Sequence, residues 1–177
     1  MPLDVMRVLF SAAEIAARVE ALAGEISRAL PAELVMVGLL KGAAVFVADL
    51  ARALDRAGAD PEIEFIRLSS YGLAKESSGA VQLLGDIPGG LTGRPVLLVD
   101  DIVDTGRSIA FAAAQLRGRG VSDLWICALL DKPQRREIEI ALDFVGFTIG
   151  DEFVVGYGTD HAEKYRHLPY IGICGLM

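Results

Sequence analysis

The sequence predicts an α/β fold with a central, mainly parallel sheet flanked by helices. Short apolar runs alternate with segments that carry apolar residues at helical spacing, and the order strand, helix, strand, helix, strand is typical of parallel sheets. The chain has 177 residues, of which 53% are hydrophobic, enough for one substantial core. No internal repeat or linker interrupts it, so residues 1–177 are interpreted as a single domain.

The first predicted element is a helix that begins at Ser11 and ends before Pro31. Glu14 stands three residues after Ser11, which is the spacing of a capping box, and apolar residues follow at helical spacing. Further strands are expected at the short apolar runs 34–40, 63–68, 95–99 and 124–130, with two short strands near Phe144 and Val154. The other helices are expected at residues 43–57 and 108–117. The polar segment 69–79 carries two glycines and is expected to be a mobile loop.

The loops that follow the predicted strands are where a ligand is expected to bind. Open parallel sheets bind their ligands beyond the carboxyl ends of the strands. In this chain those loops start after Leu40, Leu68, Val99, Leu130 and Val155. Functional side chains are therefore expected in these loops.

Charge and hydropathy exclude several classes of protein. The formal net charge of −7 argues against nonspecific nucleic-acid binding, which depends on basic residues that neutralise phosphates. No apolar stretch approaches the roughly 20 residues of a membrane helix, and the first residues lack the basic and apolar regions of a signal peptide. Cys127 and Cys174 form no CxxC motif and are interpreted as buried thiols. We therefore expect a cytoplasmic protein without nucleic-acid or membrane partners.

Three aspartates cluster where the apolar run 95–99 ends, namely Asp100, Asp101 and Asp104. Aspartates after a strand often form only a turn or a helix cap. Clustered carboxylates, however, repel one another and raise one another's pKa, and a cation or hydroxyl donors would relieve that repulsion. Asp100 and Asp101 could accept hydrogen bonds from the vicinal hydroxyls of a sugar or hold Mg²⁺, which prefers oxygen ligands.

Residues 104–108, Asp-Thr-Gly-Arg-Ser, have the parts of a phosphate site. Gly106 allows close approach of the backbone, and successive N–H groups at a helix start attract an anion. The hydroxyls of Thr105 and Ser108 can donate further hydrogen bonds. A phosphate, a diol and Mg²⁺ together indicate a ribose phosphate.

The segment 96–108 resembles the phosphoribosyl-diphosphate (PRPP) binding motif of type I phosphoribosyltransferases, an apolar strand followed by two acids, two apolar residues and Asp-Thr-Gly. Segments 39–42, 69–72, 130–133, 151–160 and 165–166 resemble hypoxanthine phosphoribosyltransferases, in the same order and over nearly the whole chain. The resemblance implies that family's fold, with a small hood formed by the terminal segments. It implies transfer of ribose 5-phosphate from PRPP to a 6-oxopurine, hypoxanthine and guanine, with Mg²⁺ as cofactor. It also implies a homodimer or homotetramer.

The resemblance assigns roles to individual residues. It implies a 5′-phosphate site at Asp104, Thr105, Gly106, Arg107 and Ser108, and ribose binding by Asp100 and Asp101. It implies pyrophosphate binding by Lys41, Gly42, Ser70, Tyr71 and Arg166, with a cis peptide between Leu40 and Lys41. It implies purine binding by Lys132, Phe153, Val154 and Asp160, and Mg²⁺ binding by Asp100, Asp101 and Asp160. Asp100 departs from the family, which commonly has Glu there, and is one methylene shorter.

Several of these roles have a chemical reason. Asp104 matches the proton acceptor for N7 of the base, and crowding by the two other aspartates would raise its pKa towards the range of a general base. Lys132 can only donate, so it favours an oxo group over the amino group of adenine. Phe153 offers an aromatic face for stacking. The loop 69–79 is expected to close over the site with Ser70 and Tyr71 and exclude water.

Other interpretations stay open on the sequence alone. Without the resemblance, Lys41 is a lysine at a strand end, Lys132 a residue of a surface turn and Phe153 a core residue. Arg135 and Arg136 are further phosphate candidates, and His161 and His167 are expected in surface or structural roles. Two related functions compete, a xanthine–guanine phosphoribosyltransferase and an RNA-binding regulator on the same fold. Asp104 and the acidic net charge count against the regulator.

Overall fold

The computed structural model describes residues 5–70 and 80–175. The strands are β1 (Val5–Phe10), β2 (Val35–Leu40), β3 (Glu62–Ser70), β4 (Val81–Leu84), β5 (Pro95–Val103), β6 (Asp123–Asp131), β7 (Phe144–Thr148), β8 (Val154–Val155) and β9 (Ile171–Cys174). The helices are α1 (Ala12–Ala29), α2 (Ala44–Arg56), α3 (Arg107–Gly118) and the short 3₁₀ helix η1 (Pro133–Arg135).

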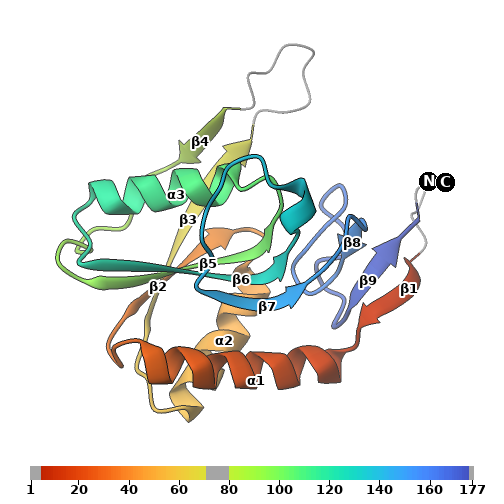
Figure 1. Ribbon diagram of the computed structural model, residues 1–177, viewed down its shortest axis with the longest axis horizontal. Coiled ribbons are helices and arrows are strands. Elements are labelled where there is room, and N and C mark those ends of the chain that lie inside the picture. Colours follow the sequence, from red (N-terminus) through yellow and green to blue (C-terminus); the bar gives the residue numbers. More distant parts are fainter. Residues whose placement is uncertain (1–4, 71–79, 176–177) are drawn as a thin grey trace.

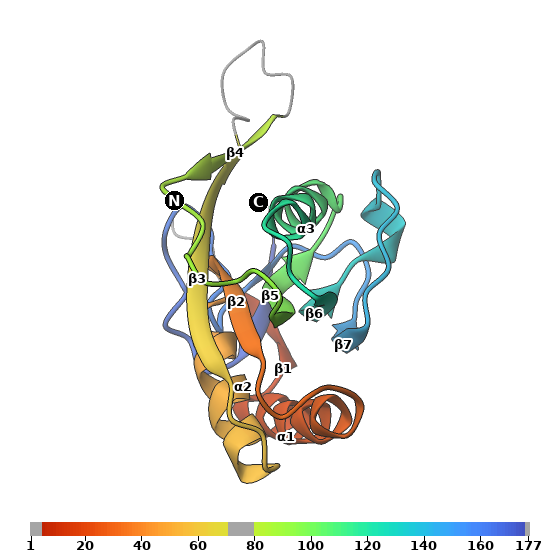
Figure 2. The ribbon, with the colours of Figure 1, turned by 90° about the vertical axis from the view of Figure 1, so that its left-hand side faces the viewer.

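A six-stranded sheet in the order β4-β3-β2-β5-β6-β7 forms the centre of the fold. Its strands pair in parallel, except for β4, which runs antiparallel to β3. Helices α1 and α2 cover one face and α3 covers the other (Figures 1 and 2). A separate apolar core fills each side, with Leu22 and Phe46 on the α1–α2 side and Ile109 and Leu116 on the α3 side. The predicted α/β class is confirmed.

A second, three-stranded sheet in the order β1-β9-β8 joins segments from the two ends of the chain. Both of its pairings are antiparallel. Figure 1 shows it beside the end of the molecule where the two termini lie. The expected hood from the terminal segments is therefore confirmed, and it carries the residues around Val154 towards the central sheet.

The first helix shows how local sequence sets an element. Its cap is Ser11, whose hydroxyl accepts from the backbone N–H of Glu14 at 3.3 Å, while a carboxylate oxygen of Glu14 accepts from the N–H of Ser11 at 2.8 Å. This reciprocal pair is the capping box that the sequence predicts.

Within the described residues, no helix combines the length and the apolar character that crossing a membrane would require.

Three strands were not predicted from the sequence, and several predicted strands differ in their ends. The sequence did not indicate β1 and β9, which pair with each other from distant parts of the chain, or β4, which lies at the edge of the central sheet beside β3. Strand β3 extends through Ser70, because Ser69 and Ser70 pair with Gln82 and Val81 of β4. Ser69 and Ser70, which were predicted to belong to a loop, are therefore strand residues, and the rest of that prediction, residues 71–79, lies outside the described residues.

Candidate active site

The carboxyl ends of β2, β5 and β6 meet at one edge of the central sheet, because these strands are parallel neighbours. Strand β5 was predicted to end at Val99 but continues to Val103, so Asp100 and Asp101 are strand residues. A cavity of about 200 Å³ opens at this edge. It is lined by Leu39, Leu40, Gly42, Leu68, Asp100, Asp101, Ile102 and Ser108.

A smaller cavity of about 80 Å³ adjoins it at the start of α3. Its lining includes Asp104, Thr105, Gly106 and Ser108. Gly106 precedes the helix with a φ of 85°, and a Cβ there would lie 2.7 Å from the carbonyl oxygen of Ile138. Only glycine fits that left-handed, crowded position. The structure thus builds the predicted phosphate turn in front of a helix N-terminus, where backbone N–H groups favour an anion.

Segment 135–138 forms hydrogen bonds with the predicted phosphate turn, residues 104–108. The carbonyl of Thr105 accepts from the N–H groups of Glu137 and Ile138 at 2.9 and 3.0 Å. The guanidinium of Arg107 donates to a carboxylate oxygen of Glu137 at 2.8 Å. The side chain of Arg107 is thereby directed at Glu137, whereas its backbone starts α3.

Asp100, which is buried, and Asp101, which is half-buried, form a mutually repelling pair. The side chain of Asp100 accepts from the N–H of Asp101 at 3.0 Å. Burial raises the pKa of Asp100 well above its ordinary value, and the neighbouring charge of Asp101 raises it further. Burial also raises the pKa of Asp101, although the nearby charge of Arg166 acts in the opposite direction. A Cβ on Gly42 would lie 2.2 Å from a carboxylate oxygen of Asp101, so the loop after β2 packs directly on this pair.

Asp104 has arginine partners that the sequence did not indicate. The guanidinium of Arg135 lies 2.8 Å from the carboxylate of Asp104 and 3.1 Å from that of Asp151. Arg136 donates to the backbone carbonyl of Asp104 at 3.1 Å and pairs with Asp131. Mutual repulsion was expected among all three aspartates. In the structure it acts between Asp100 and Asp101, whereas the carboxylate of Asp104 pairs with Arg135. Arg135 and Arg136 therefore each have protein partners in this region, and their role as phosphate ligands stays a prediction.

Lys41 and Arg166 come together through an acid that the sequence analysis missed. The ammonium of Lys41 lies 2.8 Å from a carboxylate oxygen of Glu163, and the guanidinium of Arg166 lies 3.5 Å from the same oxygen. The hydrogen bond from Lys41 lowers the pKa of Glu163. Arg166 also pairs with Asp160 at 3.0 Å. The peptide between Leu40 and Lys41 is cis, as the resemblance implied.

The predicted purine residues lie at the end of β6 and before β8. Lys132 is 6% exposed, and its ammonium donates to the backbone carbonyl of Glu152 at 2.7 Å. Its burial excludes the surface-turn interpretation. Phe153, adjacent to that carbonyl, is 38% exposed and contacts His161 edge-on with a centroid distance of 5.4 Å. It is therefore not a core residue, and Val154, which follows it, is buried in β8.

The remaining predicted residues lie apart from these clusters or outside the described part of the chain. Ser70 is the last residue of β3, and Tyr71 and the expected lid lie outside the described residues. Within residues 5–70 and 80–175 no three acidic, histidine or cysteine side chains are grouped closely enough to form a metal site. Asp160 is thus not joined with Asp100 and Asp101 in one cluster. Asp100 and Asp101 still fit Mg²⁺, because two adjacent carboxylates offer hard oxygen ligands whose repulsion a cation would relieve.

Comparison with known proteins agrees with this geometry. The family model of the phosphoribosyl transferase domain matches residues 9–162. Hypoxanthine phosphoribosyltransferases of Salmonella typhimurium and Escherichia coli are 42% identical over 170 residues, 94% of this chain and 94% of each relative. The hypoxanthine-guanine enzyme of Bacillus subtilis is 40% identical over 171 residues, 96% of this chain and 93% of the relative.

Solved structures give the same result in three dimensions. The chain is similar to a hypoxanthine-guanine phosphoribosyltransferase of Bacillus anthracis with a TM-score of 0.88 and 42% identity, covering 96% of this chain and 99% of the other. It is similar to the hypoxanthine phosphoribosyltransferase of Trypanosoma cruzi with a TM-score of 0.89 and 34% identity, covering 97% and 92%. With the phosphate turn, the acid pair and Lys132 arranged around one strand edge, the chain belongs to the hypoxanthine(-guanine) group of the phosphoribosyltransferase family.

Proposed function

We propose that this protein is a purine-salvage enzyme that transfers ribose 5-phosphate from PRPP to hypoxanthine, and also to guanine, giving IMP or GMP and pyrophosphate. One observation carries the proposal. The Asp100–Asp101 pair, the Gly42 turn and Ser108 at the start of α3 line a single cavity at the carboxyl edge of the sheet. A ligand there meets paired acids on one side and a helix N-terminus on the other, which suits a sugar diol joined to a phosphate.

The 5′-phosphate is assigned to the turn from Asp104 to Ser108. Gly106 brings the backbone close, Thr105 and Ser108 supply hydroxyls, and the N-terminus of α3 supplies a positive potential. Arg107 contributes its backbone, since its side chain binds Glu137. Asp100 and Asp101 accept hydrogen bonds from the ribose hydroxyls.

Mg²⁺ is the cofactor that the residues of this site fit. Asp100 and Asp101 would hold one ion and Asp160 a second, through water. When bound, the ion supplies positive charge that offsets the charge developing on the leaving pyrophosphate. The chain's own cations, Lys41 and Arg166, serve the same end, because they neutralise charge on the pyrophosphate as the C1–O bond breaks.

The purine is assigned to the space beside β8. Lys132 donates to the 6-oxo group, Phe153 stacks on the ring, and the backbone of Val154 and the carboxylate of Asp160 complete the contact. Support comes from the direction of the Lys132 ammonium, which reaches the carbonyl just before Phe153. Asp104, whose side chain is 40% exposed, accepts the proton from N7 as the new bond forms.

The larger-scale proposals follow from the family. We propose that residues 1–177 form a single domain, that the protein acts in the cytoplasm, and that it assembles as a homodimer or homotetramer. The net charge of −7 supports a partner list without nucleic acid. Retention of Asp104 and burial of Lys132 support an enzyme over an RNA-binding regulator.

A steady-state assay with PRPP, Mg²⁺ and four bases tests the reaction. Hypoxanthine and guanine are expected to be consumed with release of pyrophosphate, xanthine more slowly and adenine not at all. Xanthine turnover above that of hypoxanthine would establish the xanthine–guanine alternative. No turnover of any base, together with tight and salt-sensitive RNA binding, would establish the regulator and refute the proposal.

A further inference from the structure

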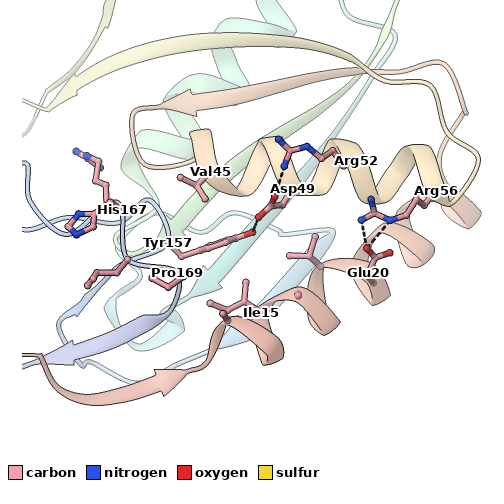
Figure 3. Close-up of a pocket in the computed structure, with 14 residues that line it drawn as sticks. Ile15, Glu20, Val45, Asp49, Arg52, Arg56, Tyr157, His167 and Pro169 are labelled. Carbon is pink, nitrogen blue, oxygen red and sulfur yellow. Dashed lines mark hydrogen bonds and ion pairs between the residues drawn. The ribbon is translucent and has the colours of Figure 1, made fainter.

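A further cavity, of about 460 Å³, lies between α1, α2 and the segment 157–169 (Figure 3). Its walls are formed by apolar side chains such as Ile15, Val19 and Val45, with charged groups at the rim. Tyr157 spans this space and approaches α2 with its hydroxyl (Figure 3). Arg166 also lines this cavity, so the segment that carries Arg166 forms one of its walls.

The side chain of Tyr157 makes a specific polar contact across this gap. Its hydroxyl donates to a carboxylate oxygen of Asp49 at 2.6 Å, and the other oxygen of Asp49 accepts from Arg52 at 2.9 Å (Figure 3). Burial raises the pKa of Tyr157 and the hydrogen bond to Asp49 raises it further, so the hydroxyl keeps its proton. Tyr157 itself has a φ of 50°, a left-handed conformation that tyrosine seldom adopts. A non-glycine residue in that conformation must be held by its surroundings.

The turn around Tyr157 is tied closely to the pyrophosphate residues. The N–H of Gly158 donates to the carbonyl of Arg166 at 3.0 Å, and the guanidinium of Arg166 donates back to the carbonyl of Gly158 at 2.8 Å. A Cβ on Gly158 would lie 2.2 Å from the carbonyl oxygen of Gly42. The turn therefore packs against the loop after β2 on one side and orients Arg166 on the other.

Asp49 belongs to the helix that continues from that same loop. Helix α2 begins at Ala44, two residues after Gly42. The hydrogen bond between Tyr157 and Asp49 thus links two segments of the chain. Asp49 lies in α2, which continues from the Lys41–Gly42 loop, and Tyr157 lies in the turn that holds Arg166. These two segments supply the cations for the pyrophosphate. A shift of either segment would change the distance between the cations.

We propose that Tyr157 and Asp49 are positioning residues that hold the Lys41–Gly42 loop and Arg166 in register for the pyrophosphate group of PRPP. This inference rests on the proposed function of the site. Neither residue touches substrate, so their effect passes through the two cations. The contact governs binding of PRPP and pyrophosphate and leaves the purine side, built on β6 and β8, unaffected.

Tyr157→Phe is the sharpest test, because it removes one hydroxyl and keeps the ring that fills the cavity. We expect the KM for PRPP and the Kd for magnesium pyrophosphate to rise by about 10-fold, as for loss of a hydrogen bond to a charged acceptor. The KM for hypoxanthine and the kcat are expected to stay near their wild-type values. Glu20→Gln is the matched control, since Glu20 binds Arg56 on the rim of the same cavity, away from the turn.

A series at Asp49 adds a rescue. Asn keeps an acceptor for the hydroxyl and Leu does not, so Asp49→Asn is expected to lie between the wild type and Asp49→Leu in PRPP affinity. Equal changes in the KM values for PRPP and hypoxanthine, or no change in either for Tyr157→Phe, would overturn the proposal. Equal changes would mean that the hydrogen bond only supports the fold.

Hydrogen exchange separates this inference from the proposed function. Tyr157→Phe is expected to speed exchange of the amides of Gly158 and Ala44, while α3 keeps wild-type protection. If the wild type formed no nucleotide from PRPP, the proposed function would fail, yet this exchange pattern would still decide the link between the two segments. Unchanged exchange at both amides would overturn the link itself.

Discussion

Asp104 lies between the proposed 5′-phosphate site and the guanidinium of Arg135. Its position in the turn before α3 places it in the proposed 5′-phosphate site, and its carboxylate pairs with Arg135. Asp104→Asn is expected to lower kcat by about 10²–10⁴-fold, the range for loss of a general base, with a much smaller change in PRPP affinity. Steady-state and single-turnover kinetics with hypoxanthine measure both.

Asp151→Asn is the control for Asp104→Asn, because it removes the other carboxylate from Arg135. Its kcat is expected to stay close to the wild-type value. Near-normal kcat in Asp104→Asn would remove this residue from proton transfer and leave it as part of the phosphate turn.

Lys132 should control the choice of base. Lys132→Ala is expected to lower kcat/KM for hypoxanthine and guanine by about 10- to 100-fold, as for loss of a hydrogen bond from a charged donor, with PRPP binding nearly intact. Lys132→Gln keeps a donor and should recover part of the activity. Unchanged kcat/KM for both bases in Lys132→Ala would contradict the assignment, and the hydrogen bond to Glu152 would then be purely structural.

Glu163 pairs with both cations that are proposed to bind pyrophosphate, Lys41 and Arg166. Because its carboxylate bridges Lys41 and Arg166, it competes with the incoming phosphates. Glu163→Gln is expected to lower the KM for PRPP by about 2- to 5-fold, in keeping with the small energy of an exposed ion pair. Glu62→Gln is the control, since Glu62 has the same 64% side-chain exposure and pairs with Arg94, far from the site in the chain. A raised KM in Glu163→Gln would show instead that Glu163 aligns the cations.

At the scale of elements, the cap of α1 is a locally determined feature with a measurable effect. Ser11→Ala removes the hydroxyl that accepts from Glu14, and is expected to lower the free energy of unfolding by about 1 kcal/mol. Urea unfolding at neutral pH measures this. Ser27→Ala on the same helix is the control, because it removes a hydroxyl that donates to the carbonyl of Ala57 and is not part of a helix cap. An equal or smaller effect for Ser11→Ala would mean that packing, and not the cap, holds the start of α1.

The same cap should depend on pH. Hydrogen bonds from Ser11 lower the pKa of Glu14 in the folded state. The unfolded chain therefore binds the proton more readily, so this contribution is present above the ordinary pKa of glutamate and is lost as the pH falls through the lowered value. Glu14→Gln should accordingly show a flatter dependence of unfolding free energy on pH in that acidic window.

Across the whole molecule, the pair Asp100 and Asp101 is expected to lower the stability of the fold, although the same pair is proposed to bind ribose and Mg²⁺. Asp100 and Asp101 repel each other without a cation, and burial raises the pKa of both. In EDTA, Asp100→Asn is expected to raise the Tm by about 2–4 °C for each kcal/mol of repulsion removed. Mg²⁺ should then raise the Tm of the wild type more than that of the variant.

Asp123→Asn is the control for this experiment, because Asp123 is an exposed residue at the start of β6. Its Tm is expected to stay near the wild-type value with and without Mg²⁺. A lower Tm for Asp100→Asn in EDTA would mean that the hydrogen bond to the N–H of Asp101 outweighs the repulsion.

Features that depend on the local pattern of residues could be predicted from the amino-acid sequence. The capping box at Ser11, the apolar runs of the central strands and the turn with Gly106 are written in neighbouring residues, and each appears where it was expected. The acid pair and Lys132 were predicted as functional residues from the same kind of short segment, and their roles stay predictions.

Contacts between segments that lie far apart in the chain could not be predicted from the sequence and became visible only in the folded structure. Strand β1 exists because it pairs with β9, more than a hundred residues later, and neither strand has a pattern that announces its partner. The same holds for Arg135 on Asp104, Glu163 between Lys41 and Arg166, and Tyr157 on Asp49. Side chains of this kind are solvated in the unfolded chain, and only the packing of helices on the sheet selects their partners.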